Sequence, residues 1–165
     1  MGSGCTKGSE NVYFRCRKEA AMHDERLSSR EGAAELLGVS PSTVADYELG
    51  NTKVVPVDKV DLMADLYNHP ELRTLYCKRE CPIGKWMPLA TNTGSLESIV
   101  LRFLKEFDKG KLEDIRSGLI DIAADGKVDS DERPEFLVLL RMMESLSLIL
   151  SEMQLAGEKI LKQSS

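Results

Sequence analysis

Residues 29–50 have the sequence SREGAAELLGVSPSTVADYELG, which predicts two short helices joined by a sharp turn. A serine just before residues 30–37 can cap the first helix, and Gly38 can end it in a left-handed conformation. Ser40 can cap the second helix, with Pro41 at its first position, where a missing backbone N–H costs nothing. The second helix then continues almost to the end of this stretch.

The residues around the turn suit two helices that cross at a steep angle. Such a crossing needs a small residue, a sharp turn and apolar anchors on both helices. Ala34 supplies the small residue, and Gly38 supplies the turn. The apolar anchors are Leu37, Val39 and Val44. The second helix then projects outward the side chains of Ser42, Thr43, Ala45 and Asp46, where a DNA groove could receive them.

This pattern resembles the helix-turn-helix family of lambda repressor, Cro and the xenobiotic-response-element-type regulators. The resemblance rests on Ala34-x-x-Leu37-Gly38-Val39-Ser40-x-Ser42-Thr43-Val44, closed by Tyr47-Glu48-x-Gly50. A five-segment helical layout over residues 11–77 is similar as well. The resemblance implies a repressor-like regulator of transcription that binds double-stranded DNA, with its recognition helix at about 41–48.

The resemblance also places the expected DNA contacts on this sequence. They are Arg30, Pro41, Ser42, Thr43 and Asp46, together with Lys53 in the following loop as a phosphate contact. Ser42 and Thr43 can bond to phosphates or bases, whereas Pro41 has no side-chain donor and Asp46 repels phosphate. The alternative is a protein–protein interaction module on the same fold. Weaker candidates for phosphate contacts are Arg15, Arg17 and Lys18 on the first helix.

Composition and charge favour a helical globular protein without a strongly basic half. Hydrophobic residues make up 42% of the 165 residues, charged residues 30% and aromatic residues 5%, so Leu, Ile, Val, Met and Ala must build the core. The net charge is −2 over residues 1–84 and −3 over residues 85–165, so a DNA-binding surface must come from arrangement. No apolar run suits a membrane helix or a secretory signal, and we expect a cytoplasmic protein.

Helix-breaking residues divide the chain into further segments and two domains. The first helix is expected at 11–26, the fourth at 57–67, and the fifth from Pro70 to about Cys77. We therefore predict an all-α fold in three parts. These are a five-helix lambda-repressor-like DNA-binding domain at 8–84, a linker at 85–94, and a helical C-terminal domain, hairpin or coiled-coil-like, at 95–163.

A long helix predicted over about 132–162 carries an apolar seam with alternating spacings of three and four residues. The seam residues expected to make a homodimer are Phe136, Leu139, Met143, Leu146, Leu150, Met153 and Ile160, with Gly157 between the last two. Packing of the seam on segments 95–124 of the same chain is the alternative, and a different protein partner is also possible for these helices.

Candidate metal-binding and catalytic residues are few. Cys5, Cys16, Cys77 and Cys81 could supply four thiolates to zinc, but their spacing is not that of a compact zinc site, and buried thiols are the alternative. His23 and His69 have no paired carboxylate or nucleophile in the sequence pattern, and we expect both at the surface. We predict no cofactor and no enzymatic activity.

Overall fold

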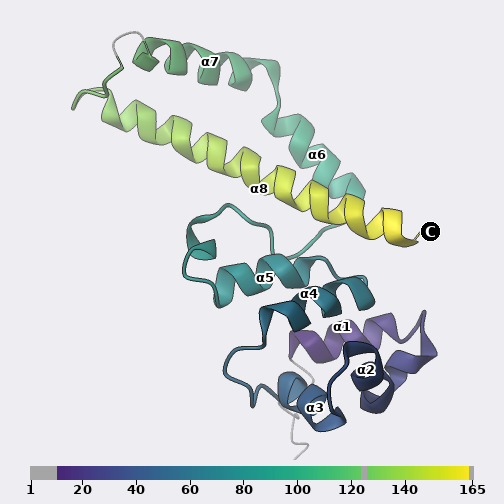
Figure 1. Ribbon diagram of the computed structural model, residues 1–165. Helices are drawn as coiled ribbons and strands as arrows, with labels where there is room; N and C mark the ends of the chain where they lie inside the picture. Colours follow the sequence, from purple (N-terminus) through teal and green to yellow (C-terminus); the bar gives the residue numbers. More distant parts are fainter. Residues whose placement is uncertain (1–10, 124–125, 164–165) are drawn as a thin grey trace, which may run out of the picture.

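The computed structural model describes residues 11–123 and 126–163, and over these ranges it contains eight α-helices, two short 3-10 helices and no strand (Figure 1). The predicted all-α fold is confirmed: five α-helices in the described part of the N-terminal half are followed by C-terminal helices that include a long α8. The helices are α1 (Val12–Ala20), η2 (Glu25–Ser28), α2 (Arg30–Leu37), α3 (Pro41–Leu49), α4 (Val57–Leu66), α5 (Glu71–Arg79), η3 (Gly84–Trp86), α6 (Leu96–Glu106), α7 (Lys109–Ala123) and α8 (Arg133–Gln163).

Local capping explains why α2 and α3 begin and end where they do. The Ser29 hydroxyl accepts a hydrogen bond from the Gly32 N–H at 3.1 Å, and the Ser40 hydroxyl accepts one from the Thr43 N–H at 3.1 Å. Gly38 closes α2 with a φ of 63°, a backbone conformation that a glycine adopts without a steric penalty. The bounds of α2 are those predicted from the sequence.

The first helix is shorter than predicted. The segment expected at 11–26 ends at Ala20, and a turn then leads into η2. The Asp24 carboxylate accepts a hydrogen bond from the Arg26 N–H at 3.1 Å and so starts the new 3-10 turn. A methyl group on Gly32 would lie 2.0 Å from the Arg26 carbonyl oxygen, so η2 can approach α2 only because residue 32 has no side chain.

The N-terminal helices enclose one apolar core. Ala34 lies at the crossing of α2 and α3 with 1% of its surface exposed, as the sequence predicted for a small residue. Leu37 and Val44 are buried beside it, and Val39 packs against the core from its edge. Further core side chains include Cys16, Leu27, Ala33, Tyr47, Val55, Val60, Met63, Ala64, Tyr67 and Leu72.

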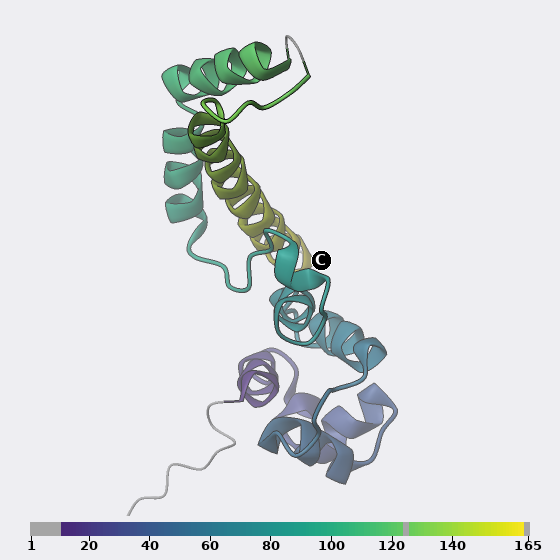
Figure 2. The same ribbon diagram turned by 90° about the vertical axis from the view of Figure 1, so that its left-hand side faces the viewer.

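The C-terminal helices form a second layer in which α6 and α7 lie along α8 (Figures 1 and 2). Ile99 of α6 and Ile149 and Ala156 of α8 are buried together, with Phe103 and Met153 packed against them. Leu139 of α8 lies so close to α7 that a methyl group on Gly118 would be 2.7 Å from its side chain. None of the helices in the described ranges is long and apolar enough to span a membrane.

The end of α8 is joined to the N-terminal helices by polar contacts. Arg73 of α5 donates to Glu158 of α8 at 3.1 Å, and Lys162 of α8 donates to Asp65 of α4. Asn68, which has a φ of 55°, donates to the carbonyl oxygen of Lys159 at 3.3 Å. These contacts hold α8 against the corner between α4 and α5.

The chain between α5 and α6 also contacts α8. The Ala90 N–H donates to the Ser151 hydroxyl at 3.1 Å, and the Gly94 N–H donates to the buried carboxylate of Glu152 at 3.0 Å. Before this, η3 packs on α5, and Trp86 within it is 90% exposed. Hydrogen bonds to α8 side chains therefore hold residues 89–94 against this helix.

Candidate nucleic-acid interface

Helix α3 is buried along one face and open along the other. Val44, Tyr47 and Glu48 face the core, whereas Pro41, Ser42 and Asp46 are exposed. Thr43 is half-buried, and its hydroxyl lies 2.8 Å from the Ser40 hydroxyl, which in turn lies 2.8 Å from that of Ser42. The first turn of α3 thus presents a group of hydroxyls to solvent, each able to donate or accept a hydrogen bond.

A buried ionic network fixes α3 from behind. The Glu48 carboxylate, 1% exposed, accepts hydrogen bonds from Arg17 Nε at 2.5 Å and Nη2 at 3.2 Å, and from Arg30 Nε at 2.7 Å. Arg17 Nη1 also donates to the carbonyl oxygens of Leu27 and Ser28 at 2.8 and 3.2 Å. Because Arg17 is buried and its charge is paired with Glu48 inside the domain, its interpretation as a phosphate contact is wrong.

The remaining predicted DNA contacts come from α1, α2, α3 and the loop after α3. Arg30, at the first position of α2, is about one-third exposed although it is paired with Glu48. Lys53 is exposed in the loop after α3. Asp46 accepts a hydrogen bond from the Asn51 side chain at 3.1 Å. Arg15 is exposed on α1, whereas Lys18 donates to the Ser28 carbonyl oxygen at 2.8 Å.

His69 is buried, contrary to the expectation from the sequence. It lies just before α5 with its Nδ1 2.8 Å from Glu71 Oε1 and its Nε2 3.3 Å from Glu19 Oε2. Lys159 of α8 brings its Nζ to 3.4 Å from the same Nδ1. The two carboxylates and the lysine come from positions 2, 50 and 90 residues away, so only the Glu71 neighbour could have been noticed in the sequence.

The cysteines in the described residues are free thiols and lie in different surroundings. Cys16 is buried, and Cys77 and Cys81 are half-buried. Burial, together with the nearby carboxylates of Glu71 and Glu19, raises the pKa of the Cys16 thiol to about 12, which disfavours the thiolate needed for metal binding. The described residues contain no group of three or more His, Cys, Asp or Glu able to hold a metal ion, and Cys5 lies outside them.

The predicted seam of α8 is divided between two environments. Leu139 is buried against α7, and Met153 packs against the core shared with α6. Phe136 and Leu146 are half-buried. The seam residues that stay about two-fifths exposed are Met143, Leu150 and Ile160.

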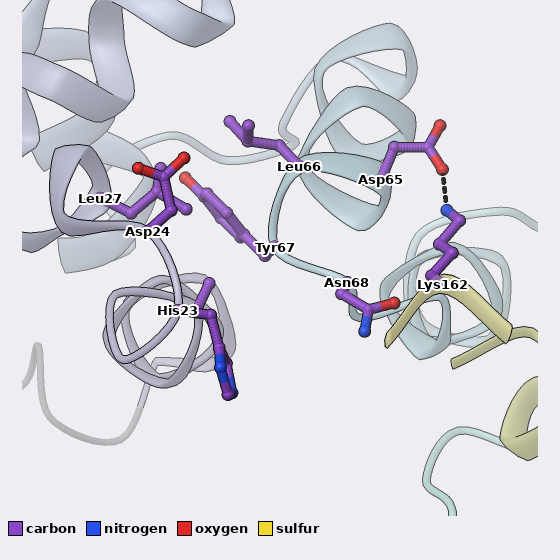
Figure 3. Close-up of a pocket in the computed structure, with 9 residues that line it drawn as sticks. His23, Asp24, Leu27, Asp65, Leu66, Tyr67, Asn68 and Lys162 are labelled. Atoms are coloured by element: carbon purple, nitrogen blue, oxygen red, sulfur yellow. Dashed lines mark hydrogen bonds and ion pairs between the residues drawn. The ribbon is translucent and has the colours of Figure 1, made fainter. Parts of the chain in front are cut away.

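Several cavities lie where the N-terminal helices meet the end of α8, and two of them are large. The larger, about 650 Å³, is lined by residues that include His23, Asp24, Asn68 and Lys162 (Figure 3). A second, about 500 Å³, lies between α1, α5, residues 91–93 and Lys159. Both are formed by segments far apart in the sequence.

Comparison with known proteins supports the assignment of the N-terminal helices. A family model described as "Helix-turn-helix domain" matches residues 15–75, which span α1 to the middle of α5. Searches of curated proteins and of solved structures returned no match. The capped α2–α3 pair, the small crossing residue and the open face of α3 agree with this match. Residues 15–75 are therefore a helix-turn-helix domain of the Cro/C1, lambda-repressor-like type.

Proposed function

We propose that this protein is a sequence-specific DNA-binding regulator of transcription, and that it binds as a homodimer with α3 in the major groove. A helix-turn-helix domain suggests DNA binding. The observation that carries the proposal is the exposed first turn of α3, because its Ser42 and Thr43 hydroxyls face solvent while Val44 and Tyr47 anchor the helix from behind. The proposal includes a DNA-binding domain at 8–84, a linker at 85–94 and a helical domain at 95–163.

Charge near α3 limits how the complex can form. Pro41, Ser42, Thr43 and Asp46 supply no cation, and Lys53 and the partly exposed Arg30 are the closest candidates along the chain for phosphate contacts. Few phosphate contacts mean that affinity depends only weakly on salt. The logarithm of the binding constant falls with the logarithm of the salt concentration, with a slope of about −0.9 for each phosphate neutralised. Specific affinity then depends on hydroxyl contacts from α3 and on two subunits binding together.

A homodimer would supply that second subunit. Met143, Leu150 and Ile160 lie on the predicted seam of α8 and are each 42% exposed, which leaves apolar surface beside the seam residues Leu139 and Met153 that pack within the chain. Covering apolar surface contributes about 25 cal/mol per Å², and a two-fold dimer matches the symmetry of near-palindromic sites.

The test of DNA binding is selection from a duplex library with a randomised centre, followed by fluorescence anisotropy on the enriched duplex. Ser42→Glu places a negative charge on the exposed turn of α3 and should weaken binding by at least about tenfold, or 1.4 kcal/mol. Ser117→Glu makes the same change on the exposed surface of α7 and should leave binding unaltered. Failure to enrich any sequence, with no binding to random duplex at low salt, would reject the proposal.

The test of assembly is sedimentation at about 50 μM, well above micromolar dimer constants. Leu150→Glu and Leu148→Glu form a matched pair, because both leucines lie on α8 and are 42% and 43% exposed, but only Leu150 belongs to the predicted seam. The wild type and Leu148→Glu should sediment as dimers, and Leu150→Glu as a monomer. A monomeric wild type would reject the homodimer.

The alternative function is a protein–protein interaction module. The observation that favours it is Asp46 on the exposed face of α3, where a carboxylate repels phosphate. This alternative predicts no measurable binding to duplex DNA at low salt, so the selection experiment distinguishes the two functions.

A further inference from the structure

We propose that the cavity of about 500 Å³ between α1, α5, residues 91–93 and α8 binds a short linear zwitterion, namely a peptide of two or three residues with a free amino group and a free carboxylate. This site lies apart from the exposed face of α3. The proposal goes beyond DNA binding and does not depend on it.

Helix α5 lines the cavity with a polar gradient. Glu71, Leu75 and Arg79 recur every four residues and therefore share one face of the helix. At 1.5 Å per residue, Glu71 and Arg79 are separated by about 12 Å along the helix axis. The wall thus has an anionic end, an apolar middle and a cationic end, which predicts a ligand of opposite polarity.

The anionic end has an acceptor without a donor. Glu71 Oε1 lies 2.8 Å from His69 Nδ1 and 3.6 Å from Lys159 Nζ. Glu71 Oε2 is buried and has no hydrogen-bond partner among the described residues. A buried acceptor left in this condition is destabilising, so a donor such as a ligand ammonium group would be stabilising there.

The cationic end has guanidinium groups with little or no pairing. Arg79 is exposed and forms no hydrogen bond or ion pair with the described part of the chain, although the cavity includes it. Arg15 of α1 reaches Glu19 only at 3.9 Å and is otherwise exposed. A guanidinium binds a carboxylate through two parallel hydrogen bonds, so this end suits the carboxylate of the same ligand.

The length of the cavity wall decides which zwitterion fits. An extended chain spans at most about 3.3–3.6 Å per residue, so three residues cover about 10 Å and reach from one end to the other with the help of the long Arg79 side chain. A single α-amino acid is too short to contact both ends. The volume lies within the range of about 300–1,000 Å³ that small-molecule sites occupy.

The larger cavity in Figure 3 does not offer the same argument. Its Lys162 is already bonded to Asp65, and its Asp24 is bonded to Arg26 at 2.7 Å. Its buried acceptor without a partner among the described residues is the Asn68 Oδ1, which is a neutral amide oxygen. With Lys162 and Asp24 paired inside the protein, that cavity does not offer a zwitterion an unpaired anionic end and an unpaired cationic end.

Isothermal titration calorimetry of the full chain with trialanine tests the site. We expect binding of trialanine, and at least tenfold weaker binding of N-acetyl-trialanine and of trialanine amide, each of which lacks one of the two charges. Free alanine, which cannot span the wall, should also bind at least tenfold more weakly. Because these ligands have nearly the same chemistry otherwise, the comparison isolates the two ends of the site.

Variants then assign each end. Glu71→Gln should reduce the preference for trialanine over its N-acetyl form, and Arg79→Met should reduce the preference over the amide. Arg141→Met removes an exposed arginine from α8 outside the cavity and should change neither preference. Arg79 is exposed, so its replacement keeps the fold even if Glu71→Gln does not.

Three results would overturn the proposal. The first is that trialanine gives no heat of binding up to about 10 mM, which is ten times a millimolar dissociation constant. The second is that the N-acetyl and amide forms bind as well as trialanine does. The third is that the Arg79→Met variant binds trialanine as the wild type does. All of them are independent of DNA, so a failure here leaves the DNA-binding proposal standing, and the reverse also holds.

Discussion

Replacing Glu48 with leucine should destabilise the N-terminal domain strongly, because Glu48 is the one carboxylate among the described residues that is bonded to the buried Arg17. Arg17 is 2% exposed and donates two of its hydrogen bonds to Glu48, so Glu48→Leu leaves a buried guanidinium without an opposite charge. Breaking a buried ion pair in this way costs about 3–5 kcal/mol. At roughly 2–4 °C per kcal/mol for a chain of this size, the melting temperature should fall by about 6–20 °C.

The double variant Arg17→Met/Glu48→Leu tests whether the unpaired charge is the cause. It removes both charges together and leaves mainly the Leu27 carbonyl oxygen without its donor, since Ser28 keeps a hydrogen bond from Lys18. That loss costs about 1–3 kcal/mol, less than the single change. The double variant should therefore be more stable than Glu48→Leu alone.

Thermal unfolding followed by circular dichroism measures both variants. Glu35→Leu is the matched control, because Glu35 is exposed on α2 and its replacement should change stability by no more than about 0.5 kcal/mol. The reasoning is refuted if Glu48→Leu costs less than about 1 kcal/mol, well below the range for a broken buried pair. It is also refuted if the double variant is less stable than Glu48→Leu.

Three further outcomes are expected. Ala34→Leu should lower stability by about 1–3 kcal/mol in a thermal melt, because the crossing of α2 and α3 has no space for a larger side chain. Hydrogen bonds from Lys162 and Arg73 lower the pKa of Asp65 below its ordinary value of 3.8. Asp65 should therefore stabilise the folded protein above that pH, and this stabilisation should be lost as the pH falls through the lowered pKa. Thermal melts at decreasing pH should show the loss, and the Asp65→Asn variant should lack this part of the pH dependence. Cys16 should react with iodoacetamide far more slowly than Cys77 in the native protein, since burial raises its pKa to about 12, and peptide mass mapping that finds equal labelling would contradict this.

The features predicted correctly from the sequence are those that depend on neighbours in the chain. The limits of α2 follow from Ser29 and Gly38, and the start of α3 follows from Ser40 and Pro41, because caps and turns are formed by residues only a few positions apart. The early end of α1 is not predicted by the sequence, because no helix-breaking residue follows Ala20 directly. It depends on the turn at Asp24 and on the close approach of η2 to Gly32.

The features that the sequence did not predict depend on distant partners. The local sequence around Arg17 is that of a surface cation, because the partner that buries it, Glu48, lies 31 residues later. His69 looked exposed because its partners Glu19 and Lys159 lie on α1 and α8. The sequence shows the apolar seam of α8, but a periodic pattern cannot distinguish a surface that packs on α6 and α7 from one that packs on a second subunit.

Trp86 has a practical consequence for anyone who studies this protein by spectroscopy. It is the one tryptophan in the sequence, and in the folded protein it is already 90% in contact with water. Its emission should therefore change little when the helices unfold, and a flat fluorescence trace would say nothing about stability. The same exposure makes it a natural reporter of the opposite event, since any molecule that covers η3 would shift its emission towards the blue without a label being attached.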